Sequence, residues 1–244
     1  MSAYEIQVRR ELLRWENQLL RPPGLMERAS KQFSDKVNQI LPQKVHDTIT
    51  ATVKGIVRTV LAGIEFAPQQ PPQLGLTLAE RDARADELLS TYKKIAAAEG
   101  AGTGAGGIML GLVDFPALLA IKMRFLFELS HLYGFSTRVP DERLFVLQVF
   151  QLAFSSPGVR PRLLDAIRHW DERAHERPQG ETNWTAIDWE QFQREYRDCI
   201  DFRKMLQLVP GIGAVVGAWA NYGLLEELGG TAKNCFRMRL IRLQ

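Results

Sequence analysis

Apolar residues recur every three or four positions along nearly the whole chain, which is the period of a helix with one buried face. No segment alternates strictly between apolar and polar residues, so no β-strand is predicted. The first predicted helix covers residues 3–21 and carries Val8, Leu12, Trp15 and Leu19 on one stripe. Further helices are predicted at about 25–41, 42–64, 77–98, 108–133, 140–154, 161–176 and 188–208, with a last apolar helix after Pro210. The pattern therefore predicts an all-α fold.

The clearest loop is APQQPPQLG at residues 67–75, because its prolines and glycine break a helical pattern. We interpret residues 1–244 as a single domain, with 1–66 as an N-terminal helical arm and 76–244 as the main helical body. Thr77 and Glu80 are spaced as a capping box, which marks the start of a helix. Near the other end, Gly229-Gly230 is predicted to turn the chain into a short basic amphipathic end.

Two apolar stretches open with glycines four residues apart. Gly107 and Gly111 are followed by Asp114, and Gly213 and Gly217 are followed by Asn221. Glycines at this spacing share one helix face and let a second backbone approach closely. We therefore predict two buried helical hairpins whose glycines lie at a helix–helix contact.

Two questions about these hairpins stay open. Their similarity arises either from an internal duplication or by chance. The uncharged span 205–225 either packs in the core, which we favour, or inserts shallowly into a membrane or docks on a membrane protein.

The charge of the chain is small but uneven. Hydrophobic residues make up 45% and charged residues 24%, with a formal net charge of +3. Residues 1–66 hold ten Lys/Arg against seven Asp/Glu, and the segment from Lys233 adds four basic residues without an acid. A mildly basic face suits an anionic membrane surface or an acidic partner, although solvated helix faces are the interpretation we favour. No nucleic-acid-binding motif is present, so nucleic acid is not an expected partner.

The two cysteines, Cys199 and Cys235, are too far apart in sequence to suggest a zinc site or a disulfide scaffold. Such sparse cysteine use is typical of the interior of a cell.

Two acids stand in apolar surroundings. Glu99 precedes a glycine-rich stretch, and Asp114 follows one. A carboxylate in such surroundings is costly unless it is paired or protonated. We favour an ion pair with Lys93, Lys122 or Arg203, or a helix-capping role; the alternative is a pocket for a lipid headgroup or a metal.

Metal chemistry is the strongest enzymatic candidate. Glu128 with His131, and Glu172 with His175, have the spacing that places two ligands on one helix face, as in di-iron bundles. The spacing is common, however, and a histidine near a helix C-terminus also interacts well with the helix dipole. We therefore predict no metal or other cofactor.

No other catalytic motif is found. The glycines at 100–107 lack the lysine of a phosphate loop, and they follow a helix instead of the strand that a dinucleotide fingerprint requires. Neither Gly-x-Ser-x-Gly nor His-Glu-x-x-His is present, so no catalytic residue is assigned.

Several long segments are distinctive: LLRWENQLLRPPGLMERASK, LPQKVHDTITATVKGIVRTVLAGIEF, KIAAAEGAGTGAGGIMLGLVDFPALLAIK, ERLFVLQVFQLAFSS and EYRDCIDFRKMLQLVPGIGAVVGAWANYGLLEELGGTAKN. At these segments, and so over nearly its whole length, the chain resembles the EcsC family. EcsC-like proteins take their name from an operon that also encodes the ATPase and membrane subunits of an ABC transporter, linked to protein export and processing in bacteria. The resemblance implies a bacterial protein that is cytoplasmic or peripheral on the membrane. It implies no catalytic residues.

We therefore expect a non-enzymatic accessory protein at the cytoplasmic face of the membrane, with membrane lipid or ABC transporter subunits as partners. The alternative is an enzyme, or a lipid- or small-molecule-binding module, with a buried carboxylate site in the helical body. The sequence predicts no particular oligomeric state.

Overall fold

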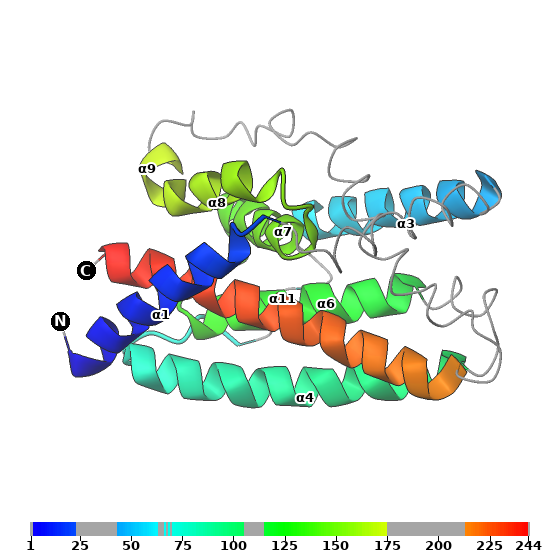
Figure 1. Cartoon of the computed structure of the whole chain (residues 1–244), viewed down its shortest axis with the longest axis horizontal. Coiled ribbons are helices and arrows are strands. Elements are labelled where there is room, and N and C mark those ends of the chain that lie inside the picture. The colour runs from blue at the N-terminus through cyan, green and yellow to red at the C-terminus, as the bar shows by residue number, and fades with distance from the viewer. Residues whose placement is uncertain are drawn as a thin grey trace.

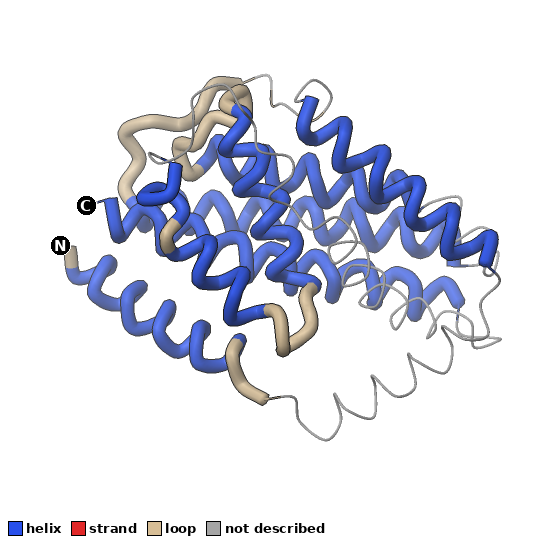
Figure 2. The backbone as a smooth tube through the Cα atoms, turned by 90° about the horizontal axis from the view of Figure 1, so that it is seen from above, coloured by secondary structure: helices blue, strands red, loops and turns tan. Residues whose placement is uncertain are grey.

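Every regular element in the described part of the chain is a helix, as predicted (Figure 2). The computed structural model describes residues 2–22, 43–62, 66, 68, 70–104, 115–174 and 213–243. The helices are α1 (Ala3–Leu19), α3 (Gln43–Ala62), α4 (Leu78–Gly104), α6 (Phe115–Leu132), α7 (Pro140–Phe154), α8 (Arg160–Arg168), α9 (Trp170–Ala174) and α11 (Gly213–Leu243). The helices predicted at about 25–41 and 188–208 lie outside the described residues.

The two longest helices form the main pair of the bundle. α4 and α11 are 27 and 31 residues long, run in opposite directions and share the most extensive helix–helix contact (Figure 1). α6 packs against both of them, and α3 packs against α6 and α7. α1 lies against α11 and α4, and the two chain termini lie at the same end of the molecule (Figure 1).

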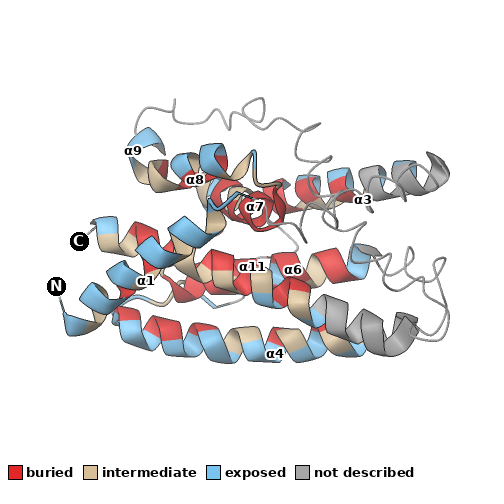
Figure 3. Ribbon diagram, viewed as in Figure 1, coloured by how far each residue is buried: buried red, intermediate tan, exposed pale blue. Residues whose placement is uncertain are grey.

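α7 is the central helix. Ten of its fifteen residues are buried, and they run almost without interruption from Leu144 to Phe154 (Figure 3). A helix that is apolar around its whole circumference must be covered on all sides. Phe145 of α7 contacts Trp170 and Phe236, with ring centroids 5.4 Å and 5.3 Å away, so this helix links α9 to α11.

One hydrophobic core runs through the described residues. Val8 and Leu12 of α1 and Val53 of α3 belong to the same cluster as residues of α6, α7 and α11. Trp15 and Leu19 pack against that cluster, so the predicted inner stripe of the first helix is confirmed. The predicted all-α single domain is confirmed as well.

The local signals for helix starts are also confirmed. Glu80 donates its backbone N–H to Thr77 Oγ1 at 3.3 Å, and Glu80 Oε2 accepts the backbone N–H of Thr77 at 2.8 Å. Pro140 opens α7, where its fixed φ suits a helix. Because the first N–H groups of a helix have no intrahelical acceptor, proline loses no hydrogen bond at this position.

Two predicted helix ends at glycines are wrong. α4 continues beyond Ala98 to Gly104, and α11 continues through Gly229 and Gly230 without a turn. A glycine inside a helix costs only about 1 kcal/mol relative to alanine, which contacts between helices readily offset. A Cβ at Gly229 would lie 2.4 Å from Leu89 Cδ1, so this glycine serves the close approach of α11 to α4.

The helix predicted at 161–176 is divided into α8 and α9. His169 leaves the helical conformation, with φ −102° and ψ 24°, and α9 begins at Trp170. The break places the Trp170 side chain, which is 2% exposed, edge-on against Phe145.

None of the helices in the described part of the chain combines the length and the apolar character needed to cross a lipid bilayer.

Candidate functional site

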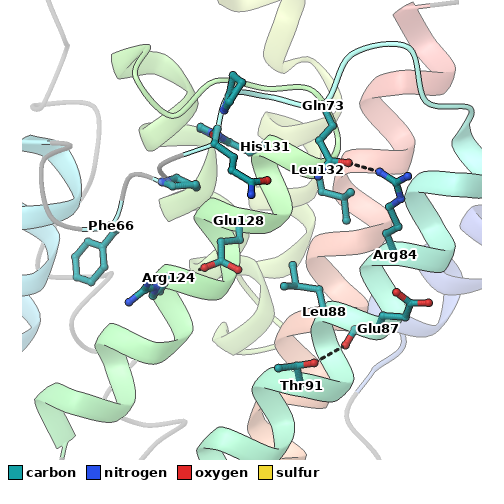
Figure 4. A pocket seen from close by; sticks show the side chains of 13 residues that line it. Phe66, Gln73, Arg84, Glu87, Leu88, Thr91, Arg124, Glu128, His131 and Leu132 are labelled. Atoms are coloured by element: carbon teal, nitrogen blue, oxygen red, sulfur yellow. Dashed lines mark hydrogen bonds and ion pairs between the residues drawn. The ribbon is translucent and has the colours of Figure 1, made fainter.

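A groove of about 880 Å³ opens between α4, α6 and the segment that precedes α4 (Figure 4). α4 contributes four residues and α6 another four, spaced so that they project from one face of each helix. The lining residues are Phe66, Pro68, Gln70, Pro71, Gln73, Arg84, Glu87, Leu88, Thr91, Arg124, Glu128, His131 and Leu132.

His131 fixes the upper wall of the groove. Its Nδ1 donates to the backbone carbonyl of Gln70 at 2.9 Å, and its Nε2 accepts the backbone N–H of Thr137 at 3.1 Å. Because Nε2 accepts a backbone N–H, the ring is the neutral tautomer protonated on Nδ1. Burial lowers the pKa of His131, which keeps the ring neutral. The backbone N–H of Gln73 donates to the His131 carbonyl at 2.8 Å, so this histidine holds the proline-rich segment against α6.

Glu128 occupies the α6 wall. Its Oε1 accepts from the Tyr92 hydroxyl at 2.8 Å and from Arg124 Nε at 3.4 Å. Burial, together with the hydrogen bond to Glu128, raises the pKa of Tyr92, so the phenol stays a proton donor.

Glu128 and His131 are therefore engaged by neighbouring protein groups instead of standing as a free metal-ligand pair. Within the described ranges, no cluster of three or more His, Cys, Asp or Glu side chains is placed to hold a metal ion. The second candidate pair cannot be compared in the same way, because His175 lies outside those ranges.

Two guanidinium groups face the groove from different walls. Arg84 Nη1 of α4 donates to Gln73 Oε1 at 2.6 Å, and the Arg124 side chain of α6 is 70% exposed (Figure 4). Thr91 donates its hydroxyl to the backbone carbonyl of Glu87. The groove thus offers arginine donors beside carboxylate acceptors, which is a binding chemistry for a polar ligand that carries an anionic group.

A second polar cluster is buried between α1, α4, α6 and α11. The Asp82 carboxylate accepts from the Tyr4 hydroxyl at 2.7 Å, the Tyr133 hydroxyl at 2.5 Å and Arg237 Nε at 2.9 Å. Burial, reinforced by Asp82, raises the pKa of Tyr4 to about 12. We call Tyr4, Asp82, Tyr133 and Arg237 the buried ionic cluster.

Three of the four basic residues from Lys233 onward are paired with acids of other helices, and only Arg242 is exposed. Lys233 binds Asp86 at 2.6 Å, and Arg237 binds Asp82 and Glu11. Arg239 is 4% exposed and binds both Glu142 and Asp171. Arg242 donates to the backbone carbonyl of Arg168. The interpretation of this end as a solvated helix face is therefore wrong for Arg237 and Arg239, because their acidic partners come from distant helices and bury them.

The structure brings few of the predicted site residues together. Glu99 is half-buried on α4, and its proposed partner Lys93 instead pairs with Glu226 of α11. Gly107, Gly111 and Asp114 lie outside the described residues, as does Arg203. Gly213, Gly217 and Asn221 fall in the first turns of α11, where the helical backbone alone is described. The predicted contact between the two glycine pairs stays a prediction.

Asp82 was not singled out by its sequence context. It stands in the charged run AERDARADE, which is typical of a solvated helix face. Only its spacing from two apolar residues, four positions after Leu78 and three before Ala85, hints at its burial, because both of these residues lie on the inner face of α4.

Known proteins match the chain, one of them over almost its whole length. The model of the EcsC protein family matches residues 6–241. Protein EcsC of Bacillus subtilis (strain 168) is 45% identical over 232 residues, which are 95% of this chain and 94% of that protein. Uncharacterized protein YdbA of the same strain is 28% identical over 146 residues, or 60% of this chain and 53% of that protein. No solved structure matches the chain. The chain therefore belongs to the EcsC protein family.

Proposed function

We propose that this protein is a non-enzymatic accessory protein that acts at the cytoplasmic face of the membrane, beside an ABC transporter linked to export. Membership in the EcsC family supports the proposal, since the family takes its name from an operon shared with such a transporter.

One observation carries the proposal: the apolar stretches of the sequence join the helical body at one end. The C-terminal end of α4 and the N-terminal ends of α6 and α11 lie together at the end of the bundle opposite the chain termini (Figure 1). Of the residues that connect α4 to α6, 105–113 carry no charge and Asp114 is the one acid; residues 205–212, directly before α11, carry no charge either. Apolar sequence that adjoins neighbouring helix ends of a bundle suits contact with a membrane-embedded partner.

The polar groups of the described residues favour binding over catalysis. Asp82 accepts three hydrogen bonds from protein groups, and both ring nitrogens of His131 are hydrogen-bonded. Cys235 is fully buried, and burial raises the pKa of its thiol, which opposes the reactive thiolate. A general acid, base or nucleophile must instead reach its substrate.

Co-purification tests the proposal. The tagged chain is expressed with the ABC transporter subunits of the same bacterium, and membranes are solubilised in mild detergent. We expect the membrane subunit to be recovered with the tag. A photo-reactive phenylalanine in place of Met109 should cross-link to that subunit, whereas the same residue in place of Glu172, whose side chain is 70% exposed on α9, should not. A chain that stays with the soluble proteins at low salt and recovers no transporter subunit would overturn the proposal.

The groove supports a second candidate function, a small-molecule or lipid-headgroup-binding module. Arg84 and Arg124 line the groove on different walls, and each guanidinium group is a hydrogen-bond donor for an anionic group of a ligand. Mass spectrometry of molecules carried through purification tests this function. A specific ligand that is present in the unmodified protein and absent from Arg84→Gln would support it, whereas the same set of small molecules in both would oppose it.

A further inference from the structure

α1 carries a second apolar stripe, on the side that faces away from the core. Ile6, Leu13 and Leu20 are 45%, 58% and 42% exposed, although the buried Val8 and Leu12 belong to the same helix. Their spacing of seven residues is about two helical turns, so the three side chains form one line along α1 and its C-cap. Exposed residues run along this helix in Figure 3.

Arginines flank this outer stripe. Arg9, Arg10, Arg14 and Arg21 are all exposed, and none of them forms an ion pair with another described residue. We call the three apolar side chains and these four arginines the outer face of α1.

The acids of α1 do not neutralise the outer face. Glu5 accepts the backbone N–H of Ser2, Glu11 binds Arg237 of α11, and Glu16 binds Arg168 of α8. These interactions direct the negative charge of the helix toward its cap and toward the body. The outer face therefore carries positive charge around a line of aliphatic side chains.

We propose that the outer face of α1 docks on a lipid surface rich in anionic headgroups. The arginines would bind headgroup phosphates, while Ile6, Leu13 and Leu20 enter the boundary between headgroups and acyl chains. The line of aliphatic side chains favours a bilayer over a nucleic acid, because a phosphate backbone has no apolar surface against which these side chains could be buried. This inference rests on the proposed function and deepens it, since it assigns the protein surface and the lipid class.

Vesicle sedimentation of the purified full chain tests this docking. We expect binding to vesicles that mix phosphatidylglycerol with phosphatidylcholine, weaker binding as salt is added, and little binding to phosphatidylcholine alone. Replacing Arg9, Arg10, Arg14 and Arg21 with glutamine should weaken binding by roughly 600-fold, since each basic residue near an anionic surface contributes about fivefold. Ile6→Asn with Leu13→Asn should weaken binding by about tenfold even at low salt.

A control variant makes the same change of charge elsewhere. Lys54, Arg58, Lys94 and Arg138 are exposed cations on α3, α4 and the turn before α7, and their replacement with glutamine should leave most of the binding intact. Circular dichroism and the melting temperature check that each variant is folded.

Three outcomes would overturn this inference. They are equal binding to both kinds of vesicle, equal loss of binding in the α1 and control variants, and a change of oligomeric state in the α1 variant, which would make the outer face a contact between copies of the chain.

If the chain still co-purifies with the transporter while vesicle binding is absent, the docking of α1 on lipid fails and the proposed function stands. If the α1 variants lose vesicle binding as expected but no transporter subunit is recovered, the lipid contact stands and the transporter role fails.

Discussion

At the scale of single residues, His131 shows how one side chain can be compatible with several sequence interpretations. Its three-residue spacing from Glu128 suggests a metal ligand, and its place near the end of α6 suggests an interaction with the helix dipole. In the structure it joins Gln70 to Thr137, on opposite sides of it in the sequence. Neither partner lies on α6, so no helical spacing could have indicated this role.

The buried ring makes stability depend on pH. Because burial lowers the pKa of His131 in the folded state below its ordinary value of 6.5, the unfolded chain binds the proton more readily. The stability that His131 contributes to the folded state is therefore complete above about pH 6.5 and is lost as the pH falls below that value. Urea unfolding between about pH 7 and about pH 5 should show a smaller loss of stability in His131→Gln than in the unmodified protein. His169→Gln, a change at a half-exposed histidine, should lose as much stability between these pH values as the unmodified protein. If His131→Gln also lost as much stability as the unmodified protein, the prediction would be contradicted.

At the scale of helices, the sequence predicts starts well and glycine-containing ends poorly. Thr77, Glu80 and Pro140 act within one helical turn, so their sequence context is sufficient. The neighbouring sequence of Gly229 is equally compatible with a glycine that ends a helix and with one that allows a second helix to pack closely. The deciding residue is Leu89, on α4, which is distant in the sequence.

Gly229 and its neighbour Gly230 form a matched pair for testing that contact. A Cβ at Gly229 would meet Leu89, whereas a Cβ at Gly230 would meet no atom within 4 Å. Gly230→Ala should stabilise the protein by up to about 1 kcal/mol through helix propensity. Gly229→Ala should be less stable than Gly230→Ala by about 1–3 kcal/mol because of overpacking, and Leu89→Ala should remove most of that difference. Thermal or urea unfolding measures each value, and equal stabilities of the two alanine variants would exclude a close contact at Gly229.

At the scale of the whole molecule, charges at distant positions in the sequence hold the helices together. Arg237 is 155 residues from Asp82 and 226 residues from Glu11, and Arg239 is 68 residues from Asp171. The basic segment at the C-terminal end therefore looks unpaired in the sequence, although its acids are present in α1, α4, α7 and α9. The helical periodicity predicts which elements exist, but it carries no information about which charged faces meet.

Arg237→Leu tests the buried ionic cluster. The substitution leaves the Asp82 carboxylate, whose side chain is 3% exposed, without its cation, and we expect a loss of about 3–5 kcal/mol in the free energy of unfolding. Arg242→Gln removes a more exposed arginine, with a 3.9 Å ion pair, and should cost less than about 1 kcal/mol. Urea unfolding measures both variants. Similar small losses would show that the cluster contributes little to stability.

The contact between α1 and α11 also has a consequence for synthesis of the protein on the ribosome. The pair of Glu11 and Arg237 spans 226 residues, and translation at about 5–20 residues per second separates the two by roughly 10–45 s. During that interval α11 is not yet present to cover Val8 and Leu12, so α1 cannot complete its packing until α11 has been synthesised. A chaperone that binds nascent chains would find its target in the inner stripe of α1, and release would follow once α11 has emerged and docked.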